Sequence, residues 1–345
     1  MPNLFYASLK LLVNLILFAL ITASSVIAQE PNSSAENTYT PPRTADGQPD
    51  LQGFWGNTTY TPMQRPENVS KEFYSPEESA DIRRGRVARE VNQTEPGTTQ
   101  DVHYDRTQFG MDRSQGILVE NLRTSMIVDP PDGRVPALSP EGQKRVADRK
   151  AESQSKGDTW DAAENARLSY RCLMFPSAGP PLLPLNDTYQ IVQSSNYVMI
   201  LIEMNHEVRI IPLDGRAQPH SNVRQWTGIS RGRWQGDTLV VETTNFNGKN
   251  PLPSQPFGTP ASGKNLRVIE RFTRVAADTI DYKFTMEDES TWVQPWSAEL
   301  PMQTGRGPIF EYACHEGNYG MINSLAGVRA DEQRAVEAAK SKESN

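Results

Sequence analysis

Histidine, arginine, tyrosine and glutamate side chains gather in two stretches of the sequence, residues 203–233 and 311–319. Eliminating a group that lies beta to a carboxylate needs a cation beside the acid, a base for the adjacent proton and an acid for the leaving oxygen. The residues whose types fit these catalytic roles are His206, His315, Tyr319 and Arg209. They indicate a lyase or dehydratase, or a related hydrolase, acting on an acidic or polyhydroxylated substrate such as a uronate-containing oligosaccharide.

An arginine-rich connector follows residue 209, although the chain as a whole is acidic with a net charge of −7. Arginine binds carboxylate or sulfate groups through two parallel hydrogen bonds, so this local excess favours an anionic ligand. The expected substrate-binding residues are Arg216, Arg224, Arg231, Trp234 and Glu316. The alternative is a solvated loop whose arginines pair with acids such as Glu242 and Glu270.

Other chemistries have weaker support in the sequence. The histidines at 206, 220 and 315 are of a metal-binding type, but no HExxH or CxxC spacing is present, so no cofactor is predicted and a divalent metal is kept as an alternative. The string from Gly228 to Gly232 matches GxSxG, but a turn and a strand follow it, where a nucleophile elbow needs a helix. The acidic charge argues against a nucleic-acid partner.

The N-terminus has the pattern of a secretory signal peptide, residues 1–28. Lys10 precedes the apolar run Leu11–Ile21, which is too short to span a bilayer, and small residues precede Gln29. We therefore expect an exported protein, periplasmic or secreted from a Gram-negative bacterium, with no membrane contact after cleavage. In that setting the two cysteines, Cys172 and Cys314, are expected to form one disulfide.

The periodicity of the remaining chain predicts a mainly β protein, an antiparallel barrel or sandwich of lipocalin-like type. Residues 29–50 are expected to be a flexible leader, 51–170 a helical, loop-rich region packed on the core, 171–327 the antiparallel core and 328–345 a C-terminal helix or tail. Ser–Pro pairs at 75–76 and 139–140 predict helix starts, the first with Glu78 as a capping-box partner. A third short helix is expected at 160–168. Strands are expected at 124–128, 189–193, 197–204, 208–213, 238–244, 266–273, 279–286 and 292–302.

Two arrangements are open for the apolar strand that begins at Tyr197 and the segment after it. One long strand would place His206 on the apolar face, whereas a hairpin would place it at the turn. The hairpin is favoured, because it pairs Ile202 with Ile210 and gives a cross-strand ion pair between Glu203 and Arg209. It leaves His206 where a ligand could reach it.

Four motifs resemble those of a large family of exported bacterial proteins that usually carry only the label "hypothetical protein". They are residues 123–133 (RTSMIVDPPDG), 203–216, 230–241 (SRGRWQGDTLVV) and 311–319 (EYACHEGNY). The resemblance covers roughly residues 41–327 and implies a single secreted unit. It implies no particular activity.

A non-enzymatic, lipocalin-like barrel that binds a small ligand is the rival interpretation. In that case Trp226, Trp234, Trp292 and Trp296 would line an apolar cavity, or they would simply belong to the core. An enzyme should instead bring histidine and arginine side chains together in one cleft. The sequence leaves the substrate and the oligomeric state open.

Overall fold

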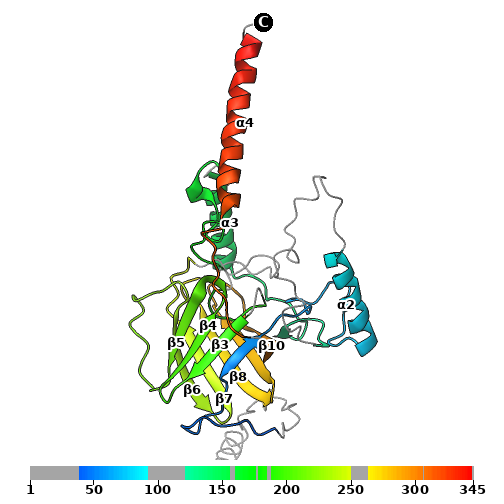
Figure 1. Ribbon diagram of the computed structural model, residues 1–345, viewed down its shortest axis with the longest axis vertical. Coiled ribbons are helices and arrows are strands. Elements are labelled where there is room, and N and C mark those ends of the chain that lie inside the picture. The colour runs from blue at the N-terminus through cyan, green and yellow to red at the C-terminus, as the bar shows by residue number, and fades with distance from the viewer. Residues whose placement is uncertain are drawn as a thin grey trace, which may run out of the picture. The chain divides into compact units, whose positions relative to one another are not determined.

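The computed structural model describes residues 39–91, 121–155, 160–175, 178–184, 188–249, 263–305 and 307–343. The expected signal peptide lies outside these residues. The described chain is mostly β and forms a nearly closed antiparallel barrel, in the order β5-β4-β3-β1-β10-β9-β8-β7-β6, with β2 paired to β10 (Figure 1). The strands are β1 (Gly53–Gly56), β2 (Ile127–Asp129), β3 (Thr188–Gln193), β4 (Tyr197–Ile202), β5 (Glu207–Pro212), β6 (Ile229–Gln235), β7 (Thr238–Thr244), β8 (Arg267–Ala276), β9 (Thr279–Glu287) and β10 (Trp296–Thr304).

Two helix starts follow the predicted capping chemistry. Helix α2 (Pro76–Val91) begins with a reciprocal capping box, in which Ser75 N donates to Glu78 Oε2 (2.8 Å) and Glu78 N donates to Ser75 Oγ (3.2 Å). Helix α3 (Pro140–Ser155) begins after Ser139, whose Oγ accepts from the backbone N–H of Gly142 (3.0 Å). Both starts were predicted correctly.

The other helical predictions need correction. The helix expected at 160–168 is only the short 3-10 helix η2 (Ala163–Asn165). The terminal helix α4 (Tyr319–Glu343) begins well before the expected residue 328. Residues 29–50 were expected to be a flexible leader, but Gln48 Nε2 donates to Ser195 O (2.9 Å) and Pro49 O accepts from Gln193 Nε2 (3.0 Å), so the end of this stretch is held against β3 and the turn that follows it.

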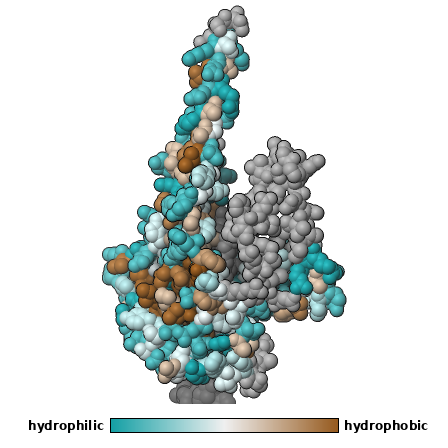
Figure 2. Space-filling view, viewed as in Figure 1, coloured by the Kyte–Doolittle hydropathy of each residue, from teal (hydrophilic) through white to brown (hydrophobic). Residues whose placement is uncertain are grey.

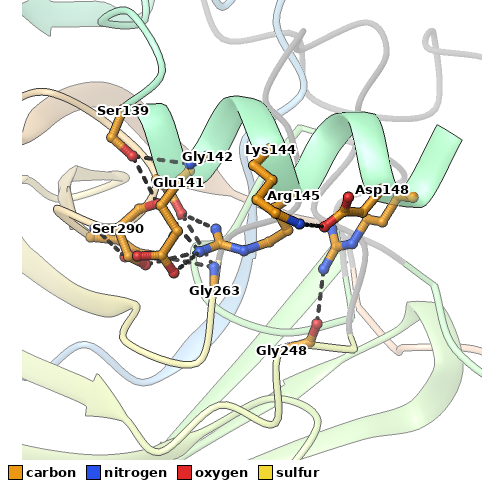
Figure 3. A network of polar contacts seen from close by, with 12 residues as sticks. Ser139, Glu141, Gly142, Lys144, Arg145, Asp148, Gly248, Gly263 and Ser290 are labelled. Atoms are coloured by element: carbon orange, nitrogen blue, oxygen red, sulfur yellow. Dashed lines mark hydrogen bonds and ion pairs between the residues drawn. The ribbon is translucent and has the colours of Figure 1, made fainter. Parts of the chain in front are cut away.

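Helix α3 docks on the loop between β9 and β10 (Figure 3). Arg145 Nη1 donates to Thr291 Oγ1 (2.8 Å), and Arg145 Nη2 donates to Ser290 O (3.2 Å). The buried Asp288 accepts from Thr291 Oγ1 (2.7 Å) and from Gly263 N (2.8 Å). Further along the helix, Arg149 Nη2 donates to Gly248 O (3.1 Å), so α3 is joined to its neighbours by polar contacts over its first three turns.

One hydrophobic cluster fills the barrel. Strand alternation places large side chains inward, as in β9, where Ile280, Tyr282, Phe284 and Met286 are all buried. The largest fully buried side chains include Trp55, Tyr189, Phe272, Tyr282 and Phe284. Trp292 and Trp296, considered as cavity-lining residues, lie in this core and pack edge-to-face at 5.7 Å. These side chains occupy space that a hollow, ligand-binding barrel would leave open.

The barrel closes where β5 meets β6, the two ends of the sheet order. Side chains close this seam. A Cβ at Gly232 would lie 2.7 Å from Leu213 Cδ2 and 2.8 Å from Ile211 Cγ2, so only glycine lets β6 approach this closely. Strand β6 was expected to be part of a connector and its strand character was missed, because arginine and glycine hide its alternation.

Candidate functional site

The central hairpin exists, but its register differs from the expected one. Strands β4 and β5 pair Ile202 with Glu207 and Ile200 with Arg209. The turn between them contains the 3-10 helix η3 (Met204–His206), where Asn205 (φ 65°) and His206 (φ 49°) are left-handed. This turn takes up residues that the expected register had assigned to strand pairs. The predicted ion pair between Glu203 and Arg209 is therefore wrong.

Arg209 points into the barrel instead of towards a ligand. It is 5% exposed, and its guanidinium donates to Glu270 Oε2 (2.6 Å) and Oε1 (3.1 Å). Further bonds reach Ser230 Oγ (3.3 Å) and Thr243 Oγ1 (3.4 Å). Burial acts to lower the pKa of Arg209, but the Glu270 carboxylate raises it above the ordinary value, so the side chain stays charged. The catalytic role expected for Arg209 is incompatible with this position.

The same cluster holds the phenol of Tyr282. Its hydroxyl donates to Glu270 Oε1 (2.8 Å) and accepts from Leu182 N (2.8 Å). Burial and the neighbouring carboxylate raise the pKa of Tyr282 well above its ordinary value. Strands β5, β6, β7, β8 and β9 each contribute one side chain to this buried polar layer. The layer ties the two sides of the seam together, which is a structural task.

His206 lies exposed at the hairpin turn, as predicted, and contacts the C-terminal strap, which we define as residues 307–318. The backbone N–H of Tyr312 donates to His206 Nε2 (2.8 Å). Beside it, burial raises the pKa of Glu203. A hydrogen bond with the backbone N–H of Phe310 opposes this shift. The expected disulfide between Cys172 and Cys314 is formed and fixes the strap a second time.

The remaining predicted catalytic residues do not converge with His206. His315, Glu316 and Tyr319 are all exposed, and Tyr319 is the first residue of α4 with 70% exposure. Among the described residues, no hydrogen bond joins any of these three side chains to His206. The structure therefore places His315 and Glu316 on the strap and Tyr319 at the start of α4, without arranging them with His206 around a common cleft.

The side chains of the expected substrate-binding arginines form hydrogen bonds with nearby groups of the protein. Arg224 Nη1 donates to Lys264 O (2.7 Å), Arg231 Nη1 donates to Ser230 O (2.8 Å), and Arg216 Nε donates to Asp214 Oδ1 (2.8 Å). The Arg216 guanidinium lowers the pKa of Asp214 to about 2. Trp234 is partly buried against the hydrophobic cluster. These side chains are held in structural contacts of the connector.

Metal ligands do not cluster in the part of the chain that the structure describes, where no group of three or more His, Cys, Asp or Glu side chains could hold an ion. His220 Nδ1 accepts from the backbone N–H of Asn222 (3.3 Å). His103 lies outside the described residues.

A concave site that the sequence did not reveal lies beside the first turns of α2. This α2 cleft has a volume of about 170 Å³. Its walls come from residues 59–62, from the start of α2 and from residues 121–123, and they carry hydroxyl, phenol, amide and guanidinium groups. The polar lining residues are Thr59, Tyr60, Thr61, Tyr74, Ser79, Arg83, Asn121 and Arg123. Pro62, Pro76, Ala80, Ile82 and Leu122 complete the lining.

Two segments that are far apart in the sequence pair at the wall of the cleft. Phe73 and Arg123 form an isolated antiparallel bridge, and Tyr74 N donates to Leu122 O (2.8 Å). The Arg123 guanidinium lies 4.9 Å from the centre of the Phe73 ring, and its Nη1 donates to Glu72 Oε1 (2.7 Å). The capping box then sets where α2 begins. Arg123 is thus positioned before any ligand arrives.

Arg123 also connects the cleft to the barrel wall. Its Nη2 lies 3.6 Å from Glu299 Oε2 on β10. Burial, and then the charge of Glu299, raise the pKa of Asp281 on β9 to about 6, while Lys283 and Arg123 oppose this shift. A cation of the cleft, Arg123, therefore interacts with two carboxyl groups of the barrel wall, Glu299 and Asp281.

Sequence reasoning reached only part of this site. The capping box located α2, and Arg123 begins the motif of residues 123–133, but nothing local shows that residue 73 pairs with residue 123. No helix among the described residues is long and apolar enough to cross a membrane. The chain matches no family model, no curated protein and no solved structure, so its resemblance to exported bacterial proteins stays a prediction.

Proposed function

We propose that the protein is an exported β-barrel protein that binds an acidic, polyhydroxylated small molecule in the α2 cleft, of the kind found in uronate-containing oligosaccharides. One observation carries the proposal. The cleft is lined by two arginines, two tyrosines, hydroxyl side chains and an amide, and no Asp or Glu side chain is among its described lining residues, although the chain is acidic overall.

Each type of lining group matches a part of such a ligand. Arginine binds a carboxylate through two parallel hydrogen bonds, and Arg123, held by the Phe73 ring, would bind the ligand carboxylate in place of its exposed partner Glu72. Tyr60 and Tyr74 offer aromatic surface and hydroxyl groups, and Asn121 offers both a donor and an acceptor. A volume of about 170 Å³ is below the roughly 300–1,000 Å³ of drug-sized ligand sites, which favours recognition of a single sugar ring.

The sequence suggested elimination or hydrolysis at a uronate. We place the same reaction class in this cleft and assign it to different residues. Arg123 would neutralise the substrate carboxylate in place of the buried Arg209, and Tyr60 and Tyr74 are the lining residues able to transfer protons. The rival proposal of a ligand inside the barrel has less support, because Trp55 and Tyr282 are among the large side chains that fill the interior.

Calorimetric titration of the full-length protein with galacturonate oligosaccharides, and with the corresponding neutral sugars, tests the binding proposal. We expect saturable binding of the acidic sugars only. Replacing Arg123 with Gln should weaken it about 10- to 100-fold, the value of one charge-assisted contact. Arg216→Gln is the matched control, because that arginine is exposed and lies outside the cleft.

Tyr74→Phe removes only a hydroxyl from the cleft. It tests the same site independently, in case Arg123→Gln does not fold. Both variants should show the far-ultraviolet circular dichroism of the wild type. Absence of uronate binding, or equal binding by wild type and both cleft variants, would overturn the proposal. Ultraviolet absorbance of the unsaturated product then separates a lyase from a binding protein.

A further inference from the structure

Three neighbouring strands carry apolar side chains on the outer surface of the barrel. In one cross-strand row, Val192 pairs with Met199, and Met199 pairs with Ile210. In the next row, Leu201 pairs with Val208. These five residues define the β3–β5 outer face. They alternate with the inward residues of the same strands, such as Ile200 and Ile211, which are fully buried.

The outer face is exposed in the isolated chain. Ile210 is 61% exposed, Val208 46% and Val192 38%. Figure 2 shows hydrophobic side chains gathered over these strands, which Figure 1 places on the same side of the barrel. Scattered apolar residues are normal on a protein surface, whereas contiguous apolar groups are found where proteins contact a partner.

The pattern of β4 shows why this face differs from ordinary barrel exterior. An antiparallel strand with one solvated face alternates apolar and polar residues, whereas β4 reads Tyr-Val-Met-Ile-Leu-Ile without a polar break. Such a continuous apolar strand is typical of sheets that are covered on both faces. The inner face of β4 is covered by the core. On the outer side, Arg216 Nη2 donates to the Tyr197 hydroxyl at the start of β4 (2.9 Å), whereas Val208 and Ile210 on the neighbouring β5 are 46% and 61% exposed.

We propose that the β3–β5 outer face is a two-fold contact with a second copy of this chain. The outward positions of the three strands that are not buried carry no charged side chain of their own: they are Thr188, Gln190, Val192, Tyr197, Met199, Leu201, Val208 and Ile210. The Arg216 side chain reaches this surface only at its edge, where it bonds to Tyr197. In a two-fold contact both copies use the same surface, so each apolar residue of this face would meet another apolar residue of the same face. An uncharged, apolar sheet face is self-complementary in this sense.

The size of the face sets the strength of the dimer. Three strands about 4.8 Å apart and six residues long cover roughly 14 by 20 Å. Stable complexes bury about 800 Å² on each partner, so this contact alone is small. The dimer is therefore weak and concentration-dependent, with a dissociation constant on the order of micromolar.

Sedimentation velocity of the full-length protein, across concentrations from below to well above micromolar, tests the proposal. We expect a monomer–dimer equilibrium in the wild type, and at least a 100-fold weaker association in Ile210→Glu. Val293→Glu is the matched control: Val293 is 63% exposed, but it lies in the loop between β9 and β10. It should dimerise like the wild type.

Val192→Glu places the same charge two strands away from Ile210 and should also abolish the dimer. Two independent variants ensure that a folding defect in one of them does not decide the result. Unfolding curves check that each variant is folded. A wild type that stays monomeric throughout, or a dimer that survives both substitutions, would overturn the proposal. A monomer would mean that a different partner covers this face.

Discussion

The guanidinium of Arg209 on β5 and the carboxylate of Glu270 on β8 form a fully buried ion pair across the seam of the barrel. Strands β6 and β7 lie between them in the closed order, and each contributes a hydroxyl, from Ser230 and Thr243, to the same arginine. Neighbouring strands elsewhere in the barrel are joined by backbone hydrogen bonds. At the seam between β5 and β6, side-chain hydrogen bonds of Arg209 join the two ends of the sheet.

Removing one partner of this pair should destabilise the barrel strongly. Glu270→Leu leaves a buried guanidinium without its counter-charge, and we expect a loss of about 3–5 kcal/mol in the free energy of unfolding. The double variant Arg209→Met with Glu270→Leu should recover most of that loss, since no charge stays buried. Urea denaturation measures both. A single variant within about 1 kcal/mol of the wild type would contradict the assigned role.

An exposed ion pair provides the matched control. Arg267 bridges Glu242 (2.8 Å) and Glu287 (2.6 Å) on the outer surface and is 39% exposed at its side chain. Solvent and side-chain entropy reduce the value of such pairs to roughly 0–1 kcal/mol. Arg267→Met should therefore change the free energy of unfolding far less than Glu270→Leu.

The contrast between Arg209 and Ser75 explains how much the sequence could predict. Helix starts depend on neighbours three residues apart, and the Ser75 capping box was visible from the sequence alone. The interior position of Arg209 depends on the length of the turn before it and on a partner 61 residues further along the chain. The turn of the structure differs in length from the expected turn, so the strands pair in a different register and Arg209 lies on the inner face.

The candidate site was less predictable than the barrel for the same reason. Strand alternation identified most of the core strands, because it is a local pattern. The α2 cleft is formed by a bridge between Phe73 and Arg123, and no local signal reports such a contact. The histidines drew attention to the strap, and His206 does contact it, since its side chain accepts a hydrogen bond from the backbone of Tyr312.

The disulfide should contribute substantially to stability because of the length of chain that it closes. Cys172 and Cys314 are 142 residues apart in the sequence, and the chain-entropy model assigns about 3–5 kcal/mol to a loop of that length. We expect the double variant Cys172→Ser with Cys314→Ser to lose an amount in this range. Denaturation with and without reductant measures it. Equal stability of wild type and variant, both without reductant, would contradict the prediction.

The hydrogen bond from the Tyr312 amide to His206 should protect that amide from exchange. His206→Leu removes the acceptor, and we expect Tyr312 to exchange hydrogen for deuterium at least ten times faster. His220→Leu is the control, because His220 contacts a different segment. Mass spectrometry of peptides from residues 307–318 reports the rate. Unchanged protection in His206→Leu would show that the disulfide alone holds the strap.

Asp281 should make stability fall as the pH rises from about 4 to about 6. Its pKa in the folded protein is about 6, above the ordinary value of 3.8, because burial and Glu299 disfavour the charged form. The folded state therefore binds more protons than the unfolded state in this window, so its advantage is lost as Asp281 ionises. Asp281→Asn should raise the free energy of unfolding at pH 7 by about 1–3 kcal/mol and leave it unchanged at pH 4.

Urea denaturation at several pH values measures this difference. The control is Asp46→Asn, an exposed carboxyl in the segment before β1. Its substitution should give parallel curves at both pH values. A stability gain for Asp281→Asn that is equal at pH 4 and pH 7 would show that packing, and not ionisation, causes the effect.

Two helix glycines should respond in opposite directions to alanine. A Cβ at Gly142 in α3 would lie 2.4 Å from the backbone oxygen of Thr291, at the contact that docks the helix on the barrel (Figure 3), whereas a Cβ at Gly85 in α2 meets nothing within 4 Å. Alanine favours a helix over glycine by about 1 kcal/mol, so Gly85→Ala should stabilise the protein by up to that amount. Gly142→Ala gains the same propensity but forces α3 away from Thr291, and overpacking of this kind costs about 1–3 kcal/mol. Urea denaturation of both variants measures the two signs. A stabilised Gly142→Ala protein would show that α3 can shift without cost, and that its docking contacts contribute little to the stability of the barrel.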